Sequence, residues 1–212
     1  MKTKRDSFTG ERPIFTGSPA IVPGGFNLDV VKQRFLANDV IAGGSLAIYN
    51  ETTRLVNIVK TGSVSVIDAV DAKILTLKVD EFYAPCFNVG DKVLETISGL
   101  FAGAPSIVSV VKTENSCVIT LSAAIVGLAV GDTLIEVVDD GAGNAAMIGN
   151  ANSLTLDDIT VSDLGETAVD VTADTMQYAL YERRVLPIPA SQKDATGSFL
   201  KVNPHIKFTQ SY

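Results

Sequence analysis

Short runs of β-branched and aliphatic residues, separated by turn-forming residues, fill the middle of the chain. They lie at residues 45–49, 54–59, 64–67, 74–79, 92–97, 107–111, 117–121 and 133–138. Their spacing is close to the interval of about 8–12 residues that is typical of β-sandwiches and small barrels. Helix-length periodic segments do not interrupt them, so a parallel sheet with crossover helices is not expected. The sequence therefore predicts an all-β protein, mainly an antiparallel small barrel or sandwich.

The same pattern of strand, connector, apolar-x-Val-Gly-Asp turn and second strand occurs twice, at residues 74–95 and 118–136. Glycine permits a positive φ at such a corner, and the aspartate can accept hydrogen bonds from the backbone amides that follow it. Two copies are too few for a solenoid. We therefore assign a structural role in turns to Gly90, Asp91, Gly131 and Asp132.

The sequence divides into three expected segments. Residues 1–38 are predicted to form an extended N-terminal arm with one short helix, residues 39–140 a barrel-like module with the two turns, and residues 141–212 a C-terminal β segment. The helix is expected from Asn27, a possible cap, followed by apolar residues at i, i+3 and i+7 spacing. These apolar residues are Leu28, Val31 and Phe35.

The N-terminal arm is interpreted either as a frayed terminus or as an extended segment that becomes ordered on a partner. Glycine and proline between residues 17 and 25 interrupt regular structure repeatedly. No apolar stretch follows the basic start of the chain, so a secretory signal is not expected. Partner docking is assigned to the positive charges of the arm, Lys2, Lys4, Arg5 and Arg12.

The composition excludes several classes of protein. Hydrophobic residues make up 46% of the 212 residues, which excludes general disorder, and no apolar run reaches the roughly 18–20 residues of a membrane span. The net charge of −7 argues against nucleic acid as the main partner, because phosphate contacts need a basic face. One histidine and two cysteines do not suffice for a histidine-built metal site or a disulfide framework. We expect no cofactor.

Several acidic groups are candidates for a catalytic or metal site. Four carboxylates could form a glycosidase pair, but the sequence does not place them across a cleft, and the turns already explain their positions. They are Asp91, Glu95, Asp132 and Glu136. The acidic loop at residues 139–144 could offer oxygens to calcium, yet it lacks the ligand pattern of an EF-hand, so a solvated turn is the preferred interpretation.

Reactive side chains receive structural interpretations as well. His205 follows Pro204 at the start of a predicted last strand, and no nucleophile elbow accompanies it. Cys86 and Cys117 are interpreted as small buried hydrophobic residues, because neither has a cationic neighbour in sequence. Arg183 and Arg184 form either a solvated pair or a clamp on a carboxylate of another subunit, with the solvated pair preferred.

Three stretches together resemble tailed-phage virion proteins of the capsid-decoration or head-fibre type, including those of Bacteroidales phages and prophages. They are an apolar-Gly strand and polar hairpin at residues 40–61, the region of both Val-Gly-Asp turns at residues 87–132, and a closing region at residues 178–187 and 204–208. The resemblance implies a non-enzymatic structural protein on a virion surface, made in the bacterial cytoplasm. Implied partners are phage capsid proteins and further copies of this chain, with a trimer suspected.

Two other functions remain as alternatives. A carbohydrate-binding or adhesin module is ranked lower, because sugar sites favour exposed aromatic rings and this chain has no tryptophan and five tyrosines. A hydrolase that uses Asp91 or Asp132 is ranked last. Neither nucleic acid nor a membrane is expected as a partner.

Overall fold

The computed structural model describes residues 13–22, 25–163, 166–175 and 178–210. Within these residues the regular structure is almost entirely short β-strands, most of them paired antiparallel. The helical elements are three 3-10 turns of three residues each, η1 (Phe101–Gly103), η2 (Glu182–Arg184) and η3 (Ala190–Gln192). The predicted all-β class is therefore confirmed. None of the described helices has the length and apolar character needed to cross a membrane.

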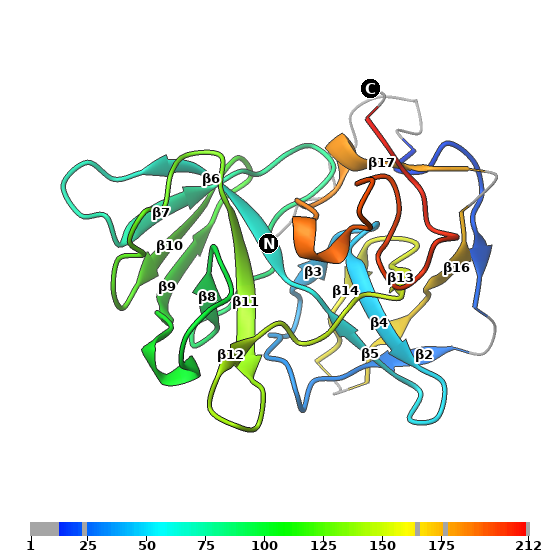
Figure 1. Cartoon of the computed structure of the whole chain (residues 1–212), viewed down its shortest axis with the longest axis horizontal. Helices are drawn as coiled ribbons and strands as arrows, with labels where there is room; N and C mark the ends of the chain where they lie inside the picture. The colour runs from blue at the N-terminus through cyan, green and yellow to red at the C-terminus, as the bar shows by residue number, and fades with distance from the viewer. Residues whose placement is uncertain (1–12, 23–24, 164–165, 176–177, 211–212) are drawn as a thin grey trace.

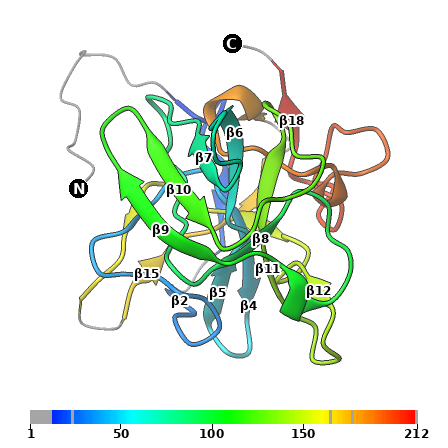
Figure 2. The same cartoon turned by 90° about the vertical axis from the view of Figure 1, so that its left-hand side faces the viewer.

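The strands form two lobes (Figure 1). The central lobe, residues 61–146, holds one seven-stranded sheet in the order β12-β11-β6-β7-β10-β9, with β8 paired to β11. An isolated bridge between Lys92 and Ser106 brings β8 beside the start of β9, so the sheet curls back on itself (Figure 2). The strands are β6 (Thr61–Ile67), β7 (Ile74–Leu77), β8 (Lys92–Leu94), β9 (Ile107–Lys112), β10 (Cys117–Leu121), β11 (Thr133–Asp139) and β12 (Ala145–Ala146).

The two copies of the repeated pattern are related by an internal two-fold pairing. In the antiparallel pair β7–β10, Ile74 lies opposite Thr120 and Thr76 lies opposite Val118. Ile74 and Thr76 occupy the same places in the first copy that Val118 and Thr120 occupy in the second, so exchanging the copies leaves the register unchanged. The second strands of the two copies, β8 and β11, also pair with each other. The repeat is therefore structural, with each copy completing the sheet of the other.

The flanking lobe is formed by the described residues before Thr61 and after Ala146. Its largest sheet has the order β13-β4-β5-β2-β15, in which β2 and β5 run parallel. These strands are β2 (Phe26–Leu28), β4 (Leu46–Asn50), β5 (Leu55–Ile58), β13 (Ser153–Leu154) and β15 (Ala168–Val169). Three small pairs complete the lobe: β1 (Ala20–Ile21) with β16 (Thr172–Asp174), β3 (Val40–Ile41) with β14 (Ile159–Thr160), and β17 (Leu180–Tyr181) with β18 (Phe208–Thr209).

The sheets group the chain differently from the segment 39–140 expected from sequence. The hairpin β4–β5 falls within that segment, but its outer partners are β13 and β2, so it lies in the flanking lobe. The chain passes into the central lobe after β5 and returns after β12 (Figure 1). The sequence indicated the hairpin, whereas its pairing with β13 joins residues about a hundred positions apart, which local patterning does not reveal.

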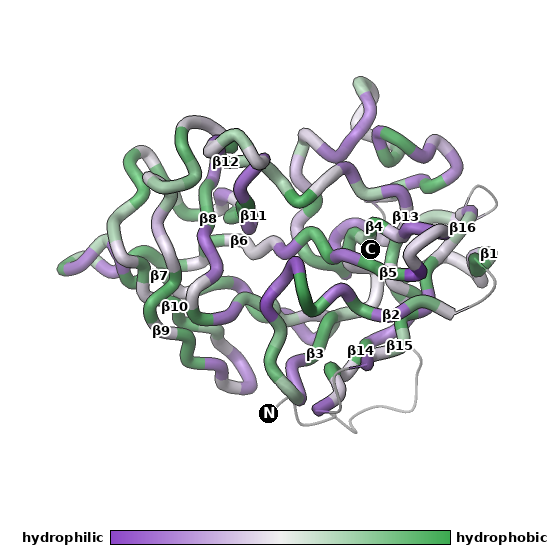
Figure 3. The backbone as a smooth tube through the Cα atoms, turned by 90° about the horizontal axis from the view of Figure 1, so that it is seen from below, coloured by the Kyte–Doolittle hydropathy of each residue, from purple (hydrophilic) through white to green (hydrophobic). Residues whose placement is uncertain are grey.

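The lobes have separate cores that meet at the crossing. The central lobe encloses a cluster that includes Leu75, Phe87, Ile119 and Leu134, and Figure 3 colours much of β7, β9 and β10 as hydrophobic. Val59, which lies between β5 and β6 at the crossing, and Ile135 on β11 pack instead into a core cluster with residues of the flanking lobe. The junction is thus packed rather than hinged.

The predicted short helix at Asn27 is wrong. Asn27 lies in β2 opposite Leu55, and the following residues form a turn in which Asp29 Oδ1 accepts hydrogen bonds from the N–H groups of Val31 (3.2 Å) and Lys32 (3.1 Å). Val31 is 93% exposed, so the apolar helical face inferred from spacing does not exist. Pairing with β5 outweighs the local helix pattern.

The described part of the arm, residues 13–22, lies on the flanking lobe. Phe15 is buried, the Tyr181 N–H donates to Ile14 O (2.8 Å), and the Thr16 N–H donates to Ala179 O (2.8 Å). The residues predicted to dock on a partner lie outside the described residues: Lys2, Lys4, Arg5 and Arg12. Their docking remains a prediction.

Candidate functional site

Lys60 is completely buried where the chain crosses between the lobes, between β5 and β6. Its Nζ atom donates to Asp91 Oδ2 (2.8 Å) and to the backbone oxygen of Arg34 (2.6 Å), and it lies 3.2 Å from Glu136 Oε1. The side chains of Lys60, Asp91 and Glu136 are 0%, 2% and 7% exposed. Buried charges of this kind persist only when they are paired and hydrogen-bonded, and these three satisfy one another. We call Lys60, Asp91 and Glu136 the ion cluster.

The segment between β2 and β3 covers the ion cluster. Gln33 Nε2 donates to Glu136 Oε2 (2.6 Å) and to Ile58 O (2.6 Å), and its Oε1 accepts from the Ile58 N–H (2.7 Å). The Lys60 ammonium lies 4.5 Å from the centroid of the Phe35 ring. Three consecutive residues of this segment thus serve the ion cluster. Gln33 holds the Glu136 carboxylate, the backbone oxygen of Arg34 accepts a hydrogen bond from the Lys60 amine, and Phe35 shields that amine from water.

A second polar link ties the Val89-Gly90-Asp91 turn to the same segment. The Asn88 N–H donates to Asp91 Oδ2 (2.9 Å), and Asn88 Nδ2 donates to Asp39 Oδ2 (2.7 Å). Lys112 on β9 pairs with the other oxygen of Asp39 (3.0 Å). The ion cluster is thus the buried end of a polar network that connects both lobes.

The ion cluster contains one cation and two carboxyl groups. Burial raises the pKa of Glu136, although the charge of Lys60 and the hydrogen bonds from Gln33 and Lys60 act in the opposite direction. Burial alone lowers the pKa of Lys60, but the carboxylates of Glu136 and Asp91 and the hydrogen bond to Asp91 outweigh it, so the net direction is upward. The pKa values of Lys60 and Glu136 are therefore both shifted upward by the same buried cluster.

The two Val-Gly-Asp turns share one backbone geometry. Gly90 and Gly131 have φ values of +94° and +98°. In each turn the aspartate accepts a hydrogen bond from the N–H group three residues earlier. Asp132 Oδ2 accepts it from Ala129 (2.7 Å), as Asp91 Oδ2 accepts it from Asn88. The sequence predicted bonds from the following amides instead, and the structure corrects this. Of the four assigned turn residues, only Asp91 also belongs to the ion cluster.

The other carboxylates that the sequence offers for catalysis do not belong to the ion cluster. Glu95 is exposed and bonds the neighbouring Thr96, and Asp132 lies at the opposite turn. In the loop at residues 139–144, Asp139 Oδ1 accepts from the N–H groups of Gly141 (2.8 Å) and Gly143 (2.9 Å). Asp140 is used in the same way within its own loop. Among the described residues no group of three or more His, Cys, Asp and Glu residues is arranged to hold a metal.

The remaining sequence candidates are scattered. The His205 side chain is 58% exposed, with Nδ1 3.9 Å from Asp174 Oδ2. Both cysteines are buried free thiols, as predicted, and burial raises the pKa of Cys86 to about 12 and that of Cys117 to about 11. Arg184 donates to Pro13 O (2.7 Å) and lies over the Tyr181 ring, 4.2 Å from its centroid. Arg184 is therefore not simply solvated.

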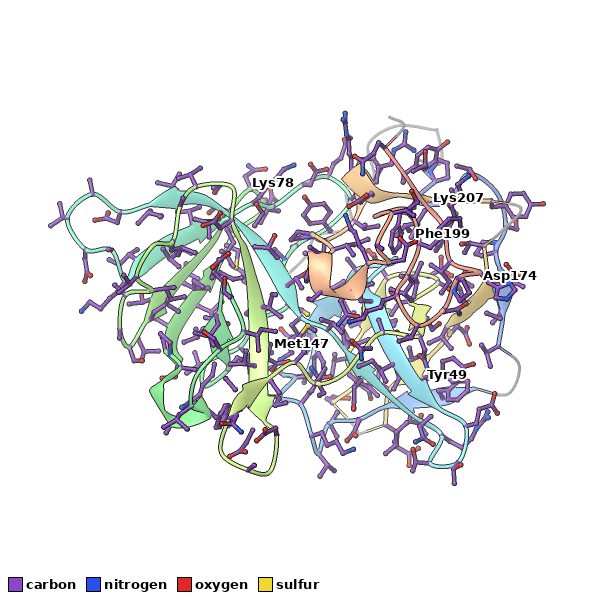
Figure 4. All side chains as sticks on the ribbon, viewed as in Figure 1. Tyr49, Lys78, Met147, Asp174, Phe199 and Lys207 are labelled. Atoms are coloured by element: carbon purple, nitrogen blue, oxygen red, sulfur yellow. The ribbon has the colours of Figure 1, made fainter. Side chains whose placement is uncertain are left out.

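Two open hollows adjoin the junction. One, of about 330 Å³, is lined by both carboxylates of the ion cluster together with Gln33 and Lys92. The other, of about 770 Å³, lies between the lobes, with Lys78 on one side and residues 182–185 on the other. Figure 4 shows Lys78 near the boundary of the two lobes, and Met147 where the chain returns to the flanking lobe.

Sequence reasoning considered Asp91 and Glu136 as carboxylates, but it missed Lys60 and Gln33 as their partners. A signal was present: Lys60 is the only charged residue in the otherwise apolar and small stretch 55–67. A lone charge in a buried run indicates a buried partner, but the sequence does not say which carboxylate it is. Comparison of the chain with protein-family models, curated proteins and solved structures finds no match.

Proposed function

We propose that this protein is a non-enzymatic structural component of a tailed-phage virion, located on the capsid surface as a decoration or head-fibre protein. The sequence resemblance motivates the proposal, and the observation that supports it is the buried ion cluster at the crossing between two β lobes. A junction locked by buried, mutually bonded groups suits a rigid spacer that is carried on a particle. The acidic body keeps many crowded copies soluble.

Capsid binding tests this proposal. Purified protein is mixed with capsids that lack it, and ordered density at symmetric positions is expected by electron microscopy. A variant with Lys2, Lys4, Arg5 and Arg12 changed to alanine should bind at least tenfold more weakly. A matched variant with alanine at Lys32, Lys73, Lys201 and Lys207 removes the same charge from described exposed or half-exposed positions and should bind normally. Absence of binding by the wild-type protein at micromolar concentration contradicts the proposal.

Self-association is part of the same proposal, because multivalent attachment at symmetric capsid sites strengthens weak contacts. Light scattering after size exclusion should give a stable homo-oligomer, with a trimer expected. A clean monomer favours a binding module instead.

The second candidate is a carbohydrate-binding or adhesin module, and the hollow between the lobes favours it. This hollow of about 770 Å³ combines Phe82 with acidic and basic side chains, including Asp80, Glu182 and Arg184. Carboxylates and guanidinium groups can bind hydroxyl groups while an aromatic ring contacts a sugar face. A glycan array decides between the candidates: a specific ligand whose binding is lost in Phe82→Ala and Asp80→Ala favours the adhesin.

A further inference from the structure

We propose that Lys60 and Asp91 condense into an intramolecular amide bond between Nζ and Cγ, with Glu136 carrying the protons. This isopeptide link would covalently join the crossing strand to the first Val-Gly-Asp turn. The inference rests on the chemistry of three side chains in the isolated chain and is independent of any virion role.

The reacting groups are already in contact. The amine lies 2.8 Å from one oxygen of the carboxyl group that it would attack, and 3.2 Å from the carboxyl group that would take its proton. All three side chains are held by further bonds, from Gln33 to Glu136, from Asn88 to Asp91 and from Lys60 to Arg34 O. Such fixed proximity supplies the large effective concentration that makes otherwise slow condensations feasible.

Burial drives the site towards neutral groups. One ammonium and two carboxylates carry a net negative charge in a place that is almost sealed from water, and the cost of desolvating such charges is several kcal/mol per ion. Condensation removes the charges of Lys60 and Asp91 together. In the bonded product the Glu136 carboxylate is the one charge of the three that is left, and it keeps the hydrogen bond from Gln33. Condensation therefore reduces three buried charges to one.

The step balances without an oxidant or a second substrate. Glu136 accepts a proton from the Lys60 ammonium, and the freed electron pair on Nζ attacks Cγ of Asp91 to form the C–N bond. Glu136 returns that proton to Oδ1 of Asp91 and relays a second proton from Nζ to the same oxygen. The Cγ–Oδ1 bond then breaks, and its electron pair leaves with the oxygen as one water molecule. Glu136 is again a carboxylate at the end, as it was at the start.

The surroundings suit this sequence of proton transfers. The Asn88 N–H points at Oδ2 and can stabilise negative charge there in the tetrahedral intermediate, in the manner of an oxyanion hole. Phe35 covers the amine. The hollow of about 330 Å³ reaches Asp91 and Glu136, and so offers the released water a way out.

The internal symmetry provides a matched site without a lysine. The N–H groups of Val64 and Ile107 donate to the carbonyls of Asp132 and Asp91, so these two residues correspond in the repeat. Four positions before Val64 stands Lys60, and four positions before Ile107 stands Gly103. Within the described part of the chain, the second turn has the equivalent residues Asp132 and Glu95 but a glycine in place of the lysine, so it is not expected to form the bond.

Intact-mass spectrometry of the purified, folded full chain tests the proposal without any variant. The wild-type mass is expected to fall below the sequence mass by one water. Trypsin should then fail to cut after Lys60 and should yield residues 55–73 joined to residues 79–92. A folded wild-type protein that keeps its full mass after prolonged incubation overturns the proposal. A water loss that maps to Asp140–Gly141, a site of succinimide formation, overturns it equally.

Variants separate the chemical roles, with far-ultraviolet circular dichroism to verify folding. Lys60→Arg and Asp91→Ala should keep the full mass. Asp91→Asn should lose one ammonia rather than one water, because the leaving group changes. Glu136→Gln should slow bond formation at least a hundredfold, with partial recovery in Glu136→Asp. Asp132→Ala should still lose one water. Undiminished bond formation in Glu136→Gln removes Glu136 from the reaction.

Discussion

At both Val-Gly-Asp corners the aspartate accepts the N–H three residues earlier, and the glycine holds a positive φ. Around Asp91 the flanking lobe adds Lys60 and buries the carboxylate, which is 2% exposed. Around Asp132 the described residues leave the side chain partly exposed. The same local sequence thus forms a plain turn in one place and an ion cluster in the other. The hydrogen bond of the turn is thus determined by the local sequence, whereas the burial and the ion pair of the aspartate depend on residues that the flanking lobe contributes.

The largest expected difference between the corners is in stability. Asp91→Ala leaves Lys60 buried with only one of its two carboxylate partners, which costs about 3–5 kcal/mol. Where the isopeptide link forms, its loss across a 31-residue separation adds roughly 3–4 kcal/mol by loop closure. Asp132→Ala should cost only about 1 kcal/mol, because it removes one exposed turn bond. Urea unfolding followed by circular dichroism measures both, and equal costs at the two corners contradict the comparison.

A smaller effect is expected from Gln33, which serves only the Asp91 corner. Gln33→Ala removes the bonds that Gln33 makes to Ile58 N–H, Ile58 O and Glu136 Oε2 in a buried site, at a cost of about 1–3 kcal/mol. Arg34→Ala, at the exposed neighbour, is the control and should change stability by less than about 0.5 kcal/mol. The free energy of unfolding in urea measures both variants.

The corners should also differ in pH dependence. Because the pKa of Glu136 is raised in the folded protein, the folded state binds this proton more tightly than the unfolded state. The ordinary pKa of a glutamate is 4.5. As the pH rises from 4.5 towards the higher pKa of Glu136 in the folded protein, the free energy of unfolding therefore falls, by at most about 1.4 kcal/mol per pH unit. Glu136→Gln removes this slope, whereas Glu95→Gln, at the corresponding and exposed position of the other copy, should leave it. Parallel stability curves for wild type and Glu136→Gln refute the assignment.

The smallest effect is expected when a lysine is added to the second corner. Gly103 has no atom within 4 Å of the position a Cβ would occupy, so Gly103→Lys should fold with a stability change within about 0.5 kcal/mol. The exposed Glu95 and half-exposed Asp132 keep their hydration, so no second water loss should appear in the mass spectrum. A second cross-link would show that burial is not required.

Sequence reasoning reached the features that depend on near neighbours. The β-rich pattern, the repeated turns and the buried cysteines all follow from residue type and short spacing, and the structure shows each of them. The prediction of a helix at Asn27 was wrong because that segment pairs with β5 as a strand. The ion cluster could not be predicted because Lys60, Asp91 and Glu136 come from three distant stretches, and a contact between them is not encoded in any one of them.

The connection between the lobes also has an architectural consequence. Thr61, where the chain enters the central lobe, lies opposite Ile135 on β11, and β12, after which the chain leaves, pairs with the other edge of β11. The two ends of the central lobe therefore lie on one side of its sheet, with a single strand between them. Any compact domain with closely spaced termini could in principle be grafted there, so this scaffold can carry an exchanged payload while its own sheet stays in register.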